Sequence, residues 1–341
     1  MKIQALGHSC FILEMENTSG EAVRILADPW LDDHVVGDVG GRFPRVRSDW
    51  SRLGPIDAVW ISHAHTDHLC PYSLIALKGE LPAGTALFLP ISLAYLEDVF
   101  REYLPEWPIH FMAQEEAIEW KGLQMQAFFN LAPEASNEDD CMILLVSNGR
   151  EAILSEADAL LPNEDPEIRE LVAQVLGQAG PEQRVFLTTR NELEASMASV
   201  DASTQDERME AVAQQRQQLA HHAESQMSAN GSENCAWTTP GTVRLIIGQG
   251  IGLPHEIPEP WNKVMFPLTL EDRARLEQET ANREGMPVTV SAVHAGEELT
   301  IRDGQIAIRA RLAEEILYTL YFIRYTLYVI PSQVCLQESG Q

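Results

Sequence analysis

The stretch that most constrains this chain lies at residues 63–68, where three imidazoles and one carboxylate fall within six residues: His63, His65, Asp67 and His68. It directly follows residues 57–62, an apolar run that predicts a short buried strand ending in a loop. In an extended or loosely turned segment, His63 and His65 point to one side, while Asp67 and His68 reach a second position. We therefore predict a metal site in which one loop serves two neighbouring cations. The alternative is a polar loop of solvated histidines, which requires four ligand-type side chains to coincide at the end of an apolar strand.

This run resembles the HxHxDH signature of the metallo-β-lactamase fold. Three neighbouring segments add to the resemblance: Gly7-His8-Ser9-Cys10-Phe11, residues 25–31, and Asp49-Trp50. They are similar to the branch that contains CMP-N-acetylneuraminate hydroxylase and lactonase-like hydrolases of the L-ascorbate-6-phosphate lactonase type. The resemblance extends from residue 1 to about residue 260 and is strongest in the first 80 residues. It implies an α/β fold, an αββα sandwich of the metallo-β-lactamase type, with the site at the ends of the strands.

The resemblance also implies ligands at two later strand ends. After the strand expected over residues 123–129, the hydroxylase-like branch has a histidine just before Pro-Glu, whereas this chain has Ala132, and Glu134 is the nearest ligand-type side chain. A carboxylate there moves the metal preference from zinc towards iron or manganese; the alternative is a solvated Glu134 and one defective site. After the strand expected over residues 151–154, Asp158 matches the aspartate that bridges two metals in the family. Glu156 is a weaker competitor, and a helix cap is the alternative role of Asp158.

The last ligand of this fold comes from a loop after a late strand, expected here over residues 242–247. His255 is the histidine placed for it, as a ligand or a proton shuttle. The glycine-rich run before it lacks GxGxxG and a following helix, so it does not predict a nucleotide loop. Asp67 and His255 are the residues that we expect to act in catalysis.

Residues near the loop at 63–68 are candidates for substrate contacts. His8 lies between the first two expected strands and either contacts substrate or is merely hydrogen-bonded. Arg42 and Arg45 lie in a locally basic loop at residues 32–49, where a guanidinium fork suits a phosphate or carboxylate on the substrate. The alternative is a solvated loop paired with surrounding acids. Asp28 ends a strand and either hydrogen-bonds a metal-binding histidine or forms a turn.

Charge and cysteine content limit the partners and the compartment. Lys and Arg number 24 against 51 Asp and Glu, which gives a net charge of −27 that repels nucleic acid and anionic membranes. The five cysteines have no CxxC spacing and predict neither a disulfide framework nor a zinc ribbon. The first residues show no signal-peptide apolar region, so we expect a cytoplasmic protein.

The expected division of the chain is a metallo-β-lactamase-like domain over residues 1–265 and a C-terminal appendage over residues 266–341. The appendage begins with a helix predicted over residues 270–283 and ends with an apolar, Tyr-rich helix over residues 311–330. Arg324 and an apolar span of only about fifteen residues argue against a transmembrane helix. This last helix is therefore expected to pack against the sandwich or to form a homodimer interface.

Three functions remain open at this level. The first is a hydrolase in which two divalent metals, most simply zinc, lower the pKa of a water that attacks an ester, lactone, amide or phosphoester of a small molecule. The second is a di-iron oxygenase that includes Glu134 among its ligands. Because neither Cys-x-His nor Cys-x-x-His occurs, the Rieske cluster of the hydroxylase is missing and an oxygenase needs a separate electron donor. The third is a degenerate, non-catalytic binding protein, since histidines are missing at positions 132 and 191–192.

Overall fold

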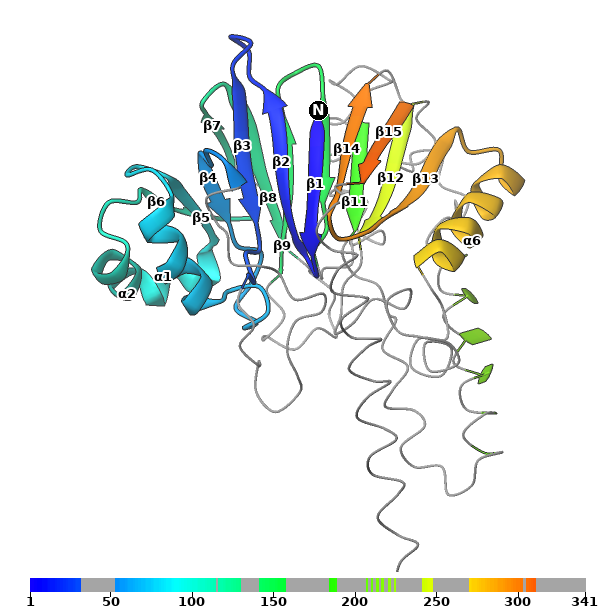
Figure 1. The fold of residues 1–341 in the computed structure, drawn as a ribbon, viewed down its shortest axis with the longest axis horizontal. Coiled ribbons are helices and arrows are strands. Elements are labelled where there is room, and N and C mark those ends of the chain that lie inside the picture. Colours follow the sequence, from blue (N-terminus) through cyan, green and yellow to red (C-terminus); the bar gives the residue numbers. More distant parts are fainter. Residues whose placement is uncertain are drawn as a thin grey trace, which may run out of the picture.

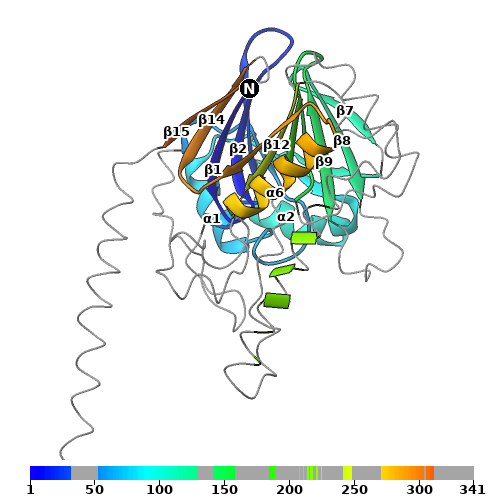
Figure 2. The same cartoon turned by 90° about the vertical axis from the view of Figure 1, so that its right-hand side faces the viewer.

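The protein is described from a computed structural model (Figure 1). It describes residues 1–31, 53–114, 116–129, 141–157, 184–188, 241–247, 270–302 and 305–310, with scattered helical positions between residues 207 and 224. Within these residues the strands form two mixed sheets that lie face to face (Figure 2).

The first sheet has eight strands in the order β15-β14-β1-β2-β3-β4-β5-β6. They are β1 (Lys2–Gly7), β2 (Cys10–Glu16), β3 (Ala22–Ala27), β4 (Ala58–Trp60), β5 (Ala86–Pro90), β6 (Ile109–Met112), β14 (Glu297–Arg302) and β15 (Gln305–Ala310). The strands from β15 to β3 pair antiparallel, and those from β3 to β6 pair parallel. Phe11 pairs with Ala27, and Ala27 pairs with Trp60. The carboxyl ends of β3 and β4 and the β1–β2 turn therefore lie at the same end of the strands.

The second sheet has seven strands in the order β13-β12-β11-β10-β9-β8-β7. They are β7 (Ala117–Trp120), β8 (Leu123–Phe129), β9 (Met142–Ser147), β10 (Ala152–Ser155), β11 (Arg184–Thr188), β12 (Thr242–Ile247) and β13 (Val288–Val293). Strands β7 to β10 pair antiparallel and β10 to β13 pair parallel. Every residue of β9 to β12 is buried, as expected for strands covered on both faces.

Helices cover the outer face of each sheet. The helices α1 (Pro71–Glu80), η2 (Ile91–Leu96, a 3₁₀ helix) and α2 (Glu97–Tyr103) pack on the first sheet through a buried cluster that includes Val59, Leu77 and Phe100. Helix α6 (Leu270–Arg283) packs on the second sheet, with Leu270 and Ala274 against Ile246 of β12. A third and larger cluster fills the space between the sheets. This order of layers confirms the predicted αββα sandwich of the metallo-β-lactamase type.

A buried ion network fixes α6 to the second sheet. Arg244 of β12 and Glu277 of α6 are both fully buried, and Arg244 Nε donates to Glu277 Oε2 at 2.6 Å. Arg273 Nε donates to the other oxygen of Glu277 at 2.9 Å. Burial by itself would raise the pKa of the Glu277 carboxyl, but the two guanidinium groups outweigh burial and lower it. Glu277 is therefore held as an anion between two cations inside the protein.

One expected helix differs from the structure. The sequence predicts a single helix over residues 92–103 capped by Ser92, and that prediction is wrong. The structure has η2 followed by α2, and at the start of η2 the described residues show no side-chain cap hydrogen bond. Pro90 ends β5 and lies at the N-cap position, so the helical turn already begins at Ile91 and Ser92 lies inside it, where it cannot cap.

The described part of the C-terminal region consists of α6 and three strands. The bounds of α6 agree with the helix predicted over residues 270–283. Strand β13 pairs with β12, and β14 pairs with β1 and carries β15 at the edge. Residues 288–293, 297–302 and 305–310 are thus strands of the two sheets, and the Tyr-rich run at 311–330 lies outside the described residues. Among the residues that the structure describes, no helix is both long enough and apolar enough to cross a membrane.

Candidate metal centre

The candidate site lies at the end of the first sheet where the carboxyl ends of β3 and β4 meet. Asp28 follows β3, Ser62 and the loop at residues 63–68 follow β4, and His8 lies in the turn between β1 and β2. The hydrogen-bonded pairing of β3 with β4 continues past the end of β3, because the Asp28 amide donates to the Trp60 carbonyl at 2.8 Å. The amide of Met142, at the start of β9, donates to the Ser62 carbonyl at 2.8 Å and ties the loop to the second sheet. Both sheets therefore set the position of the loop.

Asp28 is the acceptor that orders this loop. Its Oδ1 accepts the Ser62 amide at 2.7 Å, and its Oδ2 accepts the Ser62 hydroxyl at 2.7 Å and His68 Nδ1 at 2.8 Å. Asp28 is almost fully buried and has a φ of 40°, a left-handed conformation that Asp tolerates better than most residues. The predicted contact between Asp28 and a histidine of the loop is confirmed. Ser62 is not among the residues predicted from the sequence. Its position directly before His63 is the signal that could have indicated it.

The hydrogen-bond network assigns the protons on two of the imidazoles. A carboxylate only accepts, so the Ser62 hydroxyl donates to Asp28 and its oxygen accepts Nδ1–H of His63 at 2.9 Å. His68 likewise donates Nδ1–H to Asp28. Both rings then carry the proton on Nδ1 and the lone pair on Nε2, which is the tautomer that binds a metal through Nε2. His63 and His68 are both buried, so packing fixes these orientations.

His63 and His65 form the first set of donors. His63 Nε2 and His65 Nδ1 lie 2.8 Å apart, with ring centroids separated by 4.4 Å. His65 is exposed at the surface, whereas His63 is buried. Since His63 Nε2 carries a lone pair, the two nitrogens share one proton or one cation between them.

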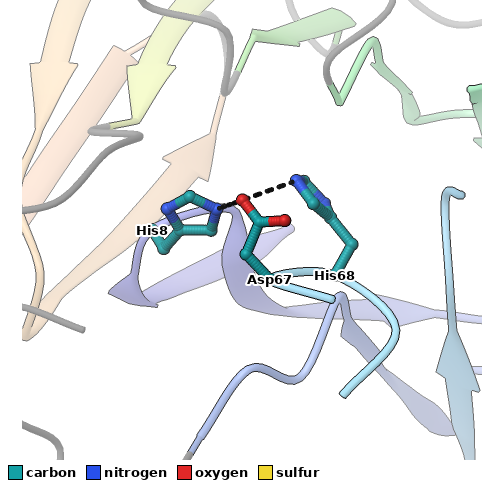
Figure 3. A group of neighbouring side chains, drawn as sticks. All are labelled: His8, Asp67 and His68. Atoms are coloured by element: carbon teal, nitrogen blue, oxygen red, sulfur yellow. Dashed lines mark hydrogen bonds and ion pairs between the residues drawn. The ribbon is translucent and has the colours of Figure 1, made fainter. Parts of the chain in front are cut away.

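Asp67 and His68 form the second set, together with His8. Figure 3 shows the Asp67 carboxylate between the two rings, with Oδ2 at 2.9 Å from His8 Nε2 and at 3.9 Å from His68 Nε2. The ligand atoms of all three residues lie within 4.8 Å of one another. Burial by itself would raise the pKa of the Asp67 carboxyl, but the hydrogen bond from His8 and the nearby His68 outweigh burial and lower the pKa well below its ordinary value. Nε2 of His68 and the anionic carboxylate of Asp67 are donors suited to a divalent cation, and His8 lies against the carboxylate.

Several predicted site residues lie outside the described residues: Arg42, Arg45, Glu134, Asp158 and His255. Glu156, the weaker competitor of Asp158, is described and buried. Burial raises the pKa of the Glu156 carboxyl, whereas the charge of Arg244 and a hydrogen bond with Thr188 act to lower it. Glu156 therefore belongs to the charged network of the second sheet.

Comparison with protein families identifies this architecture. Residues 2–140 match the model of a beta-lactamase superfamily domain. These residues are less than half of the chain, and over them the chain is similar to the beta-lactamase superfamily. The match of this superfamily domain includes β1 to β8, and with them His8, Asp28 and the whole loop at residues 63–68.

The chain is also similar to individual proteins. A UPF0173 metal-dependent hydrolase of Thermofilum pendens is 35% identical over 68 residues, which are 20% of this chain and 26% of the relative. A protein of Mycolicibacterium smegmatis named "Putative Rieske 2Fe-2S iron-sulfur protein" is 31% identical over 74 residues, which are 22% of this chain and 13% of that protein. The matches thus span about a quarter or less of these relatives. The solved structure of CmlA, a diiron β-hydroxylase from Streptomyces venezuelae, aligns with 88% of this chain and 54% of its own at 16% identity and a TM-score of 0.48.

Proposed function

We propose that this chain is a metal-dependent hydrolase that acts on an ester, lactone, amide or phosphoester of a small molecule with two divalent cations, zinc in the first place. The observation that carries the proposal is the convergence of His63, His65, Asp67 and His68 with the proton assignment that leaves Nε2 of His63 and His68 unprotonated. The relative from Thermofilum pendens, named as a metal-dependent hydrolase, agrees with it.

Each residue has a defined task in this proposal. His63 and His65 would hold one cation, Asp67 and His68 would hold the other, and Asp158, Glu134 and His255 are proposed as the further ligands. When bound, the cations supply Lewis acidity and lower the pKa of a water molecule. Asp28 and Ser62 keep the two buried rings in the ligating tautomer. Arg42 and Arg45 are proposed to bind an anionic group of the substrate.

Reconstitution tests this function. Protein stripped with a chelator and reloaded with Zn²⁺ is assayed on p-nitrophenyl acetate, a δ-lactone, a p-nitroanilide and bis(p-nitrophenyl) phosphate. We expect hydrolysis of at least one substrate that disappears with the metal and in Asp67→Asn but persists in Asp98→Asn, an exposed aspartate on α2. Hydrolysis that Asp67→Asn leaves unchanged, or its absence on all four substrates with metal bound, would contradict the proposal.

A second candidate is an iron-dependent oxygenase. The relative named as a Rieske iron–sulfur protein favours it, because such a cluster delivers electrons. Since this sequence has no Cys-x-His, the electrons have to come from a separate donor. Protein that purifies with iron and consumes dioxygen when supplied with dithionite and methyl viologen would support this candidate over the hydrolase.

A further inference from the structure

His8 occupies a backbone conformation that few residues other than glycine adopt. Gly7 and His8 follow one another in the β1–β2 turn with φ values of 107° and 51°. Glycine adopts such angles freely, whereas a side chain with a Cβ atom is disfavoured there. A non-glycine residue kept in this conformation is often explained by what its side chain does, and this one points into the second set of donors (Figure 3).

The ring of His8 is buried and packs against two other rings. The side chain is 4% exposed. Its edge meets Trp30 at a centroid distance of 5.0 Å and an interplanar angle of 87°, and it meets His68 at 5.3 Å and 63°. This orientation directs Nε2 at Asp67 Oδ2, 2.9 Å away. A residue 59 positions earlier in the chain therefore makes the contact that orients the Asp67 side chain.

The proton in this contact decides what His8 does. A carboxylate oxygen accepts and does not donate, so the proton lies on His8 Nε2. A ring nitrogen that carries a proton has no lone pair for a metal. Nε2 of His8 is thus used as a donor to Asp67, while Asp67 stays beside Nε2 of His68.

We propose that His8 is a positioning residue, which donates Nε2–H to Asp67 Oδ2 and thereby holds the Asp67 carboxylate in the orientation that binds the second cation. The inference rests on the proposed function, because it assigns a role towards the cation held by Asp67 and His68. It differs from the expectation that His8 contacts the substrate, since the ring nitrogen facing the site is engaged by a protein carboxylate.

Two variants that differ by one methylene test the role. In His8→Gln the amide nitrogen reaches the position of Nε2 and keeps a donor to Asp67. In His8→Asn the amide nitrogen lies near the position of Nδ1 and cannot reach Asp67, while Asn tolerates a positive φ better than other side chains. Chelator competition with Co²⁺, the visible Co²⁺ absorption bands and thermal melting of metal-free protein are measured for the wild type and both variants.

We expect His8→Asn to bind its second equivalent of Co²⁺ about 10- to 100-fold more weakly than the wild type. His8→Gln should stay within about threefold of the wild type with unchanged bands, and both metal-free variants should melt near the wild type. Unchanged affinity in His8→Asn overturns the inference. An equal loss in both variants with shifted bands also overturns it, because the imidazole is then a ligand itself. Wild-type protein that binds Co²⁺ with this ranking but hydrolyses nothing contradicts the proposed function and leaves the role of His8 intact.

Discussion

Replacement of Asp28 by asparagine is expected to change proton positions on two histidines without changing the shape of the site. Asp28 accepts three hydrogen bonds on two oxygens, whereas an amide has one acceptor oxygen. If that oxygen replaces Oδ2, the amide NH₂ faces the Ser62 N–H, and two opposed buried donors cost about 1–3 kcal/mol. If it replaces Oδ1, the NH₂ faces Ser62 Oγ and His68 Nδ1.

The second orientation satisfies every group once two protons move. His68 Nδ1 accepts from the amide, and the Ser62 hydroxyl turns to donate to His63 Nδ1, so both rings carry their proton on Nε2. To bind a metal through Nε2, both rings then have to move their proton back to Nδ1. This change breaks one or two hydrogen bonds and costs about 1–3 kcal/mol. This corresponds to roughly a 10- to 100-fold lower affinity for metal. The stability of metal-free protein should fall by less than about 1.5 kcal/mol, because the network stays satisfied.

The assay combines chelator competition for Zn²⁺ with ¹⁵N NMR of the imidazoles, which reports the tautomer directly. Asp57→Asn is the matched control, because Asp57 also accepts a main-chain amide, that of Arg24, and lies outside the donor sets. Zn²⁺ affinity in Asp28→Asn equal to that of the wild type, or Nδ1–H tautomers retained in the variant, would contradict the role assigned to Asp28.

Two further predictions concern stability. Glu277→Gln removes the buried carboxylate that Arg244 and Arg273 share, so we expect a loss of about 3–5 kcal/mol at pH 7. The folded-state pKa of Glu277 lies below its ordinary value of 4.5. The stability that the Glu277 carboxylate contributes is therefore present above about pH 4.5 and is lost as the pH falls through the folded pKa. In urea unfolding, the difference in unfolding free energy between the wild type and Glu277→Gln should become smaller in acid. Gly122→Ala places a Cβ 2.8 Å from Thr18 Oγ1 at a φ of 73°, and we expect a loss of about 1–3 kcal/mol in urea unfolding.

Matched variants decide both predictions. Glu279→Gln removes an exposed carboxylate of α6 that pairs only with Arg275 in the described contacts, and it should change stability little at either pH. A gap between Glu277→Gln and wild type that is constant with pH would contradict the ionised network. Gly20→Ala has a φ of 84° but no atom within 4 Å of the new Cβ, so it should cost less than Gly122→Ala. Equal losses would mean that the contact with Thr18 is relieved at no cost.

The layers of this fold were predictable because they depend on local patterns. Strand β1 alternates buried and partly exposed residues, and β12 and α6 were expected over the residues where they are found. The loop at residues 63–68 could be predicted as a metal site because three histidines and one aspartate lie within six consecutive positions. Asp28 was expected near a loop histidine because it ends a strand.

The remaining features depend on strand register, which the sequence does not specify locally. The hydroxyl of Ser62 meets a carboxylate 34 residues earlier only because β3 and β4 pair in one particular register. The same holds for His8 and Asp67, and for Arg244 and Glu277, which are 33 positions apart. Buried charges such as Arg244 are unexpected in a strand until the partner helix is in place. Strands β14 and β15 return to β1 from a distant part of the sequence, and no local pattern indicates this pairing.

The most direct test of a metal site at residues 63–68 is the metal content of protein purified without added metal, measured by elemental analysis for the wild type, His65→Ala and His221→Ala. Both histidines are exposed, but only His65 belongs to the donor sets. We predict at least one equivalent of a divalent transition metal in the wild type and in His221→Ala, and a loss of about one equivalent in His65→Ala. The same metal content in all three proteins would contradict this prediction.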